Sequence, residues 1–193
     1  LHLHEVSRSA RMHVPHVFEE EVYQAAKTIL AGLHPESIHA HNFQGLIGAV
    51  CAAVESSAPT VYTAHDFGLI CMSWYLYDGT LTPCSGPEPS KCRRCLIRNH
   101  PVSIQASIAR HLPAAVLKRL KPGVDPRSYQ RLNEIRRFHE TVETHLPLAL
   151  GLLKRFDAIV APSPWMAQAL IRHGAPAERV HLVTCGVSRW NVA

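Results

Sequence analysis

The sequence "FDAIVAPSPWMAQALIRHGAPAERVHLVTCG" (residues 156–186) contains the pattern that decides the fold. A short apolar run, FDAIV, leads through Pro-Ser into an amphipathic stretch that begins at Pro164 and stops at Gly174. Proline is favoured in the first turn of a helix and glycine directly after its end, so this stretch predicts a helix. RVHLV then returns to the apolar, β-branched residues typical of a strand. The segment therefore predicts a strand, a helix and a second strand.

The same order of elements occurs earlier in the chain. The short runs ESIHAH (residues 36–41) and APTVYTAH (residues 58–65) are expected to be buried strands, and the alanine-rich residues 44–57 between them suit a helix. A further amphipathic helix is predicted over residues 18–33. Strand, helix, strand units of this length join parallel strands. We therefore expect an α/β fold with a Rossmann-like parallel sheet and helices on both of its faces.

Four cysteines fall in the segment 68–99, which is rich in Gly, Pro and Ser and is predicted to be a long ordered loop. The last two form a CxxC pair, which can present two thiolates to one tetrahedral ion, and the other two could complete a four-sulfur zinc site. An iron–sulfur cluster, two disulfides and thiols without a metal remain as alternatives. The four residues are Cys71, Cys84, Cys92 and Cys95. By contrast, Cys51 and Cys185 lie in apolar elements and are expected to be core residues.

The composition is that of a soluble, globular chain of 193 residues, enough for one domain with a full core. Its net charge of +5 is uneven, because Lys91 to Arg137 holds twelve Lys or Arg against two acidic residues. Such a block attracts phosphates, nucleic acid or anionic lipid, or it is simply a solvated face of the helical part expected over residues 101–155. Because no signal peptide is visible and no apolar run approaches the roughly 20 residues of a membrane span, we expect a cytoplasmic location.

Polar residues follow three of the expected strands. Binding groups of α/β proteins lie at the carboxyl ends of parallel strands, where the loops converge and the following helices present free N–H groups. His65 could act there as a general base, or bind a sugar hydroxyl or a phosphate, and the adjacent Asp66 could orient it or bind hydroxyls itself. His41 and Asn42 follow the preceding strand, and Ser163 follows a later one. Asn42 and Ser163 also suit the simpler role of helix N-caps.

Four stretches of the sequence together resemble the N-terminal domain of glycosyltransferase family 4 enzymes, in the bacterial subset that carries a cysteine loop. They are SIHAHN, TVYTAHDFGLIC, DGTLTPCSGPEPSKCRRCL and RFDAIVAPSPWMAQALIRHGAPAERVHLVTCGVS. The resemblance implies the GT-B fold of two Rossmann-like domains. Residues 1–188 would form the first, acceptor-binding domain, incomplete at both ends, and residues 189–193 would begin the linker to a donor domain.

The resemblance also implies an activity. It is metal-independent, retaining transfer of a sugar from a nucleotide-sugar to a saccharide or lipid-linked acceptor, so no catalytic metal is expected. His65 and Asp66 match the catalytic positions, while His41, Asn42 and Ser163 match substrate-binding ones. Without the donor domain we expect this chain not to catalyse transfer alone. Its basic block would then contact the inner face of a membrane peripherally, or an anionic acceptor.

Two other hypotheses use the same residues differently. The first is a non-enzymatic zinc module that contacts nucleic acid or a partner through residues 91–137. Base-stacking aromatics between the basic residues would favour it, but only Tyr129 and Phe138 are in or beside the block, so nucleic acid is not the expected partner. The second is a non-catalytic partner protein with the transferase fold.

Overall fold

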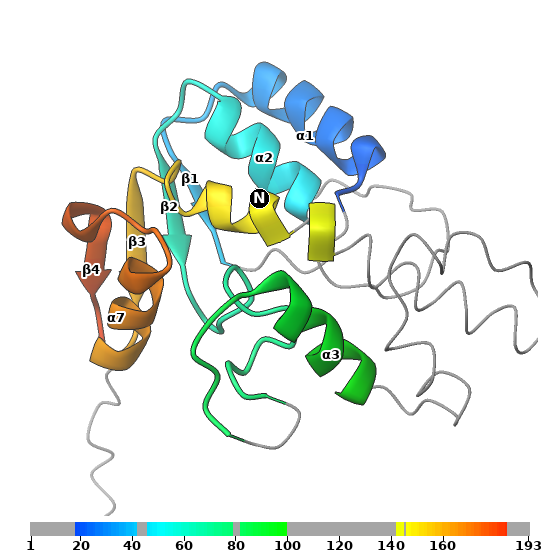
Figure 1. The fold of residues 1–193 in the computed structure, drawn as a ribbon. Coiled ribbons are helices and arrows are strands. Elements are labelled where there is room, and N and C mark those ends of the chain that lie inside the picture. The colour runs from blue at the N-terminus through cyan, green and yellow to red at the C-terminus, as the bar shows by residue number, and fades with distance from the viewer. Residues whose placement is uncertain (1–17, 42–45, 79–81, 100–141, 145, 185–193) are drawn as a thin grey trace, which may run out of the picture.

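The computed structural model describes residues 18–41, 46–78, 82–99, 142–144 and 146–184 (Figure 1). Helices and strands alternate along most of this part of the chain. In order they are α1 (Glu20–Leu33), β1 (Ile38–Ala40), α2 (Ile47–Glu55), β2 (Thr60–Thr63), α3 (Pro89–Asn99), the helical residues 142–144 and 146–152, β3 (Ala158–Ala161), α7 (Pro164–Arg172), a 3₁₀ turn (Ala177–Arg179) and β4 (Val180–Leu182).

The four strands form one parallel sheet in the order β1-β2-β3-β4. The register pairs Ile38 with Thr60, Val61 with Ala158, and Ile159 with Val180. All neighbours are parallel, which confirms the predicted α/β, Rossmann-like fold. Residues 36–41 contain the predicted strand, β1, but the expectation that it is buried was wrong, because β1 lies at an edge of the described sheet and His39 is exposed.

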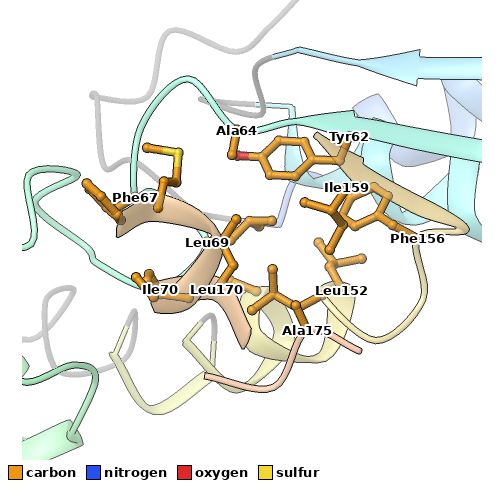
Figure 2. Packing of buried hydrophobic residues seen from close by; sticks show 14 of the residues in the cluster. Tyr62, Ala64, Phe67, Leu69, Ile70, Leu152, Phe156, Ile159, Leu170 and Ala175 are labelled. Atoms are coloured by element: carbon orange, nitrogen blue, oxygen red, sulfur yellow. The ribbon is translucent and has the colours of Figure 1, made fainter. Parts of the chain in front are cut away.

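The hydrophobic core is built around the two central strands. Tyr62 of β2 stacks on Phe156, with ring centroids 5.1 Å apart, and Ile159 of β3 lies beside them. Leu152 and Leu170 close the cluster from two helical segments, as Figure 2 shows. Full burial of a side chain of this size contributes about 1.5–3 kcal/mol to the stability of the fold. The packing of these side chains therefore holds the helices against the central strands.

Helices α1 and α2 pack closely against each other (Figure 1). A side chain at Gly48 would place its Cβ 2.5 Å from the backbone oxygen of Glu19, so only glycine permits this approach. The N-cap of α2 is Leu46, so the suggestion that Asn42 caps this helix was wrong. Asn42 itself lies outside the described residues.

The cysteine segment is not the continuous loop that its composition predicted. Its second half is the helix α3, Pro89–Asn99, which begins with a proline and contains the CxxC pair. Leu96 of this helix packs with Met72, Val142 and Leu146 in a second, smaller cluster. All three partners lie outside the helix, and two of them, Val142 and Leu146, are more than forty residues further along the chain than Leu96. Local sequence therefore could not reveal the surface that stabilises α3.

Candidate functional site

Three histidines from two neighbouring strands meet at the carboxyl ends of β1 and β2. His39 and His41 are two residues apart, so they project from the same face, and their ring centroids are 4.0 Å apart. The ring of His41 is stacked against that of His65 with centroids 5.4 Å apart, and Nδ1 of His41 lies 3.1 Å from Nε2 of His65. All three residues are exposed. The site therefore presents a row of imidazoles to solvent.

At the end of the row away from His65, His39 contacts a side chain of β2. Nε2 of His39 lies 2.7 Å from Oγ1 of Thr63. The pKa of His39 is lowered, first because its ring is partly desolvated and then because positive charge on His41 or His65 would repel a proton. The bond between His41 and His65 needs one ring nitrogen with a proton and one without. The row therefore combines ring nitrogens that donate with ring nitrogens that accept, and both kinds are exposed to a ligand.

Asp66 follows His65 and shapes the turn after β2. Its Oδ1 accepts a hydrogen bond of 2.8 Å from the backbone N–H of Gly68, the pattern of an Asx turn. The next residue, Phe67, donates its N–H to the carbonyl oxygen of Trp74 at 3.0 Å. Asp66 is therefore a half-buried carboxylate in a turn that is itself anchored to the segment carrying the cysteines.

Ser163 lies at the same edge of the sheet, directly after β3. Its Oγ accepts a hydrogen bond of 3.2 Å from the backbone N–H of Met166, and Pro164 occupies the first turn, so the predicted N-cap is confirmed. Thr63 pairs with Val160 in the register of β2 and β3. Ser163, which follows β3, therefore lies on the chain next to the one that leads from β2 to His65. The hydroxyl of Ser163 still has its own proton to donate.

Trp165 also lies at this edge, although it was not among the residues predicted from the sequence. It lies at the start of α7, its side chain is 46% exposed, and its ring meets that of Phe67 edge-on with centroids 4.6 Å apart. The signal that could have found it is a tryptophan immediately after the capping serine and its proline, where the first turn of a helix faces the strand ends.

A larger hollow lies elsewhere and does not belong to this site. It has a volume of about 440 Å³ and lies between the C-terminal ends of α1 and α2, with Lys27, His34 and Glu55 in its lining. Both helices end just before a strand begins, so the hollow is at the amino edge of the sheet, away from the histidine row.

The four cysteines of the loop are brought together around one small cavity. Its volume is about 20 Å³, and all four side chains line it. They are thiols, and none is in a disulfide. Burial raises the pKa of the Cys92 thiol, and nearby Cys71 and Cys84 add to this effect. Cys51 is buried in α2, 3% exposed, which confirms its predicted role as a core residue, whereas Cys185 lies outside the described residues.

Most of the basic block lies outside the residues that the structure describes. Of the side chains that are described, Arg93 forms an ion pair of 3.2 Å with Glu143, and Lys91 donates to Oγ of Ser85 at 2.9 Å. Among the helices in the described ranges, none is both long and apolar enough to cross a membrane. Membrane and nucleic-acid contacts of this block therefore stay predictions.

Comparison with known proteins adds one finding. The family model described as Glycosyltransferase Family 4 matches residues 14–189, which is most of the chain. No curated protein and no solved structure matches the chain. The match spans β1 to β4, and with them His41, His65 and Ser163.

Proposed function

The chain belongs to glycosyltransferase family 4, and we propose that it is the acceptor-binding, N-terminal part of a retaining glycosyltransferase. The donor is a nucleotide-sugar held by a second, C-terminal domain, and the acceptor is a saccharide or a lipid-linked saccharide. Transfer takes place between the two domains and needs no catalytic metal. The 193-residue chain alone is inactive in this proposal.

The hydrogen bond between His41 and His65 is the observation that carries the proposal. If Nδ1 of His41 donates to Nε2 of His65 across their 3.1 Å separation, neutral His65 must carry its own proton on Nδ1. That N–H is then a donor for a hydroxyl of the sugar being transferred. His41 sets the tautomer of His65, in the way that a partner of one imidazole nitrogen fixes the role of the other.

The remaining residues of the edge bind the acceptor. Asp66 accepts hydrogen bonds from sugar hydroxyls, while its Oδ1 bond to Gly68 keeps the carboxylate in place. Ser163 donates its hydroxyl proton, and Asn42, which lies outside the described residues, adds polar contacts. The exposed ring of Trp165, held edge-on by Phe67, offers the acceptor a flat apolar surface.

Location follows from the same proposal. In this proposal the enzyme works in the cytoplasm, peripherally at the inner face of the membrane. The basic residues from Lys91 onward would contact anionic headgroups there, at about 1 kcal/mol for each Lys or Arg close to the surface.

The test is reconstitution of transfer. The chain is joined after residue 193 to a nucleotide-sugar-binding domain of the same family, and incubated with labelled nucleotide-sugars and with saccharide or lipid-extract acceptors. We expect label to move to an acceptor, and His65→Ala to lower the rate by about 10²–10³-fold, the loss typical when one hydrogen-bond donor to the transition state is removed. The chain without the added domain should transfer nothing.

Two controls separate the proposal from its rivals. Asp157→Ala, at the opposite edge of the sheet, should leave the rate per folded molecule unchanged, whereas normal turnover by His65→Ala would refute the assigned role. Salt-sensitive retention of the chain on single-stranded nucleic acid, without transfer, would instead favour the zinc module that acts through residues 91–137.

A further inference from the structure

We propose that Cys71, Cys84, Cys92 and Cys95 bind one structural zinc ion, which holds the cysteine segment in place beyond the strand ends. This inference goes beyond the proposed function and does not depend on it. It would hold equally for an active enzyme and for a non-catalytic protein of the same fold.

The first argument is convergence. The four cysteines span 25 residues and come from three parts of the chain, yet all line the same cavity. Cys71 lies in the turn after β2, and Cys84 ends a short hairpin in which Tyr77 and Pro83 form a β-bridge. Cys92 and Cys95 are one turn apart on α3, so they project from the same face of that helix. Figure 1 places α3 and this segment beyond the carboxyl ends of the strands.

The second argument is size. A cavity of roughly 10–15 Å³ is enough for one water molecule, and this cavity measures about 20 Å³. The space between the thiols is therefore large enough for one ion. Four thiolates in a tetrahedron are a standard ligand set for structural zinc. Because four cysteines can also hold an iron–sulfur cluster, metal analysis has to distinguish the two.

Zinc binding requires the sulfurs to turn toward a common centre. Within the described ranges, no three His, Cys, Asp or Glu side chains are arranged to hold a metal ion as they stand. The sulfur of Cys71 lies 3.2 Å from Oγ of Ser73, that of Cys84 donates to the oxygen of Gly86 at 3.5 Å, and that of Cys95 donates to the oxygen of Tyr77 at 3.9 Å. Thiols are weak donors, so these contacts are readily exchanged for bonds to a metal.

The surroundings suit the charge of such a site. Four thiolates and one Zn²⁺ carry a formal charge of two negative, and Lys91 lines the cavity beside Cys92. Arg93 and Arg94 lie between the two ligands of the CxxC pair. Arg93 is paired with Glu143, so Lys91 is the cation that lines the cavity, and its charge can offset part of the negative charge.

The ion would also order the edge that carries the histidine row. The backbone N–H of Cys71 donates to the oxygen of Phe67 at 2.7 Å, and Phe67 is the residue directly after Asp66. On the other side, Gly86 has a φ of +119° and lies against the ring of His173, at the end of α7, so closely that a Cβ there would clash with it. The segment is thus attached at both sides, and zinc would fix its middle.

Metal analysis of the 193-residue chain, purified in zinc-containing medium, tests the proposal. We expect about one zinc and no stoichiometric iron per chain, and loss of the zinc in Cys92→Ser and Cys95→Ser. Cys51→Ala removes a sulfur that does not line the cavity and should keep the zinc. Zinc retained by the double variant Cys92→Ser/Cys95→Ser would overturn the assignment of ligands.

A second measurement covers the case in which the variants do not fold. Metal-free wild-type chain is titrated with Co²⁺, which absorbs strongly when thiolates surround it in a tetrahedron. We expect absorbance to saturate at one equivalent and to disappear when Zn²⁺ is added. No cobalt–thiolate absorbance, a stoichiometric iron–sulfur spectrum, or fewer than six titratable thiols in the unreduced, denatured protein would each refute the proposal.

Discussion

The two edges of the parallel sheet use polar groups in different ways. At the amino edge, Oδ2 of Asp157 accepts the backbone N–H of Thr60 at 2.7 Å and lies 3.2 Å from its hydroxyl, while Arg179 donates to the oxygen of Phe156 at 3.0 Å. At the carboxyl edge, the imidazoles of His41 and His65 contact each other and solvent. Asp157 and Arg179 at the first edge therefore serve the fold, whereas the exposed rings of His41 and His65 at the second edge remain available to a ligand.

The pKa values follow the same division. The pKa of Asp157 is lowered, mainly because its carboxylate accepts the Thr60 N–H, so the folded chain stabilises the charged form. At the carboxyl edge the pKa of His39 is also lowered, but partial desolvation is the first cause and the folded chain disfavours the charged form. The folded chain therefore stabilises the charged form of Asp157 at the amino edge and the neutral form of His39 at the carboxyl edge.

The largest expected difference between the edges is in stability. Asp157→Ala removes the acceptor for two Thr60 donors, one of them on a residue that is only 3% exposed. We expect a loss of about 1–3 kcal/mol in the free energy of unfolding. His65→Ala, which removes an exposed ring, should change it by no more than about 0.5 kcal/mol. Urea denaturation of both variants measures the comparison.

Asp157→Asn is the matched control, because it keeps one oxygen acceptor and should recover part of the loss. At about 2–4 °C for each kcal/mol in a chain of this size, the difference is also visible as a shift in Tm. Equal destabilisation by Asp157→Ala and His65→Ala would show that the carboxyl edge is structural too.

An intermediate effect on stability is expected at Ser163, which caps α7 and, in the proposal, also binds the acceptor. Ser163→Ala removes the cap of α7 and should cost about 1 kcal/mol. Ser163→Asp keeps a good N-cap but has no hydroxyl proton to donate, so it should retain stability. If the hydroxyl binds the acceptor as proposed, both variants raise the KM of the reconstituted enzyme. An unchanged KM for Ser163→Asp would leave the residue with its capping role alone.

The smallest effect is a pH dependence from the histidine row. Because the folded chain lowers the pKa of His39, the unfolded chain binds more protons near the ordinary histidine value of about 6.5. Stability should therefore be full above this pH and fall as the pH is lowered through it. His39→Gln should reduce that slope in denaturation measured at several pH values, while His173, whose pKa is also lowered, contributes the same background to both proteins. A slope unchanged by the substitution would contradict this account.

The sequence predicted the parts of the fold that depend on short-range pattern. The helices at residues 18–33 and 164–174 are marked by their apolar spacing and their ends, and the structure has α1 and α7 there. The strand-end positions of His65 and Ser163 followed from the same units, because a parallel sheet places the ends of its strands at one edge. The helix α3 was missed because its packing surface comes from residues far away in sequence.

The site shows the same limit. Sequence selected His41 and His65 separately, as residues after two different strands, but their hydrogen bond depends on the register that pairs Ile38 with Thr60. The contact between Trp165 and Phe67 depends likewise on how α7 packs against the turn after β2. A register or a packing angle is set by the whole core, and no local run of residues contains it.

By itself, the sequence determined the alternation of strands and helices, the position of polar residues at strand ends and the cysteine spacing. These depend on residue type and on periods of a few residues, which can be read locally. Only the tertiary structure decided that the four cysteines line one cavity and that three histidines form a row. It also decided that Asp157 accepts a hydrogen bond from Thr60 at the opposite edge of the sheet. The physical reason is that these arrangements depend on residues far apart in the sequence, such as His41 and His65 or Thr60 and Asp157, which the packing of the core brings together.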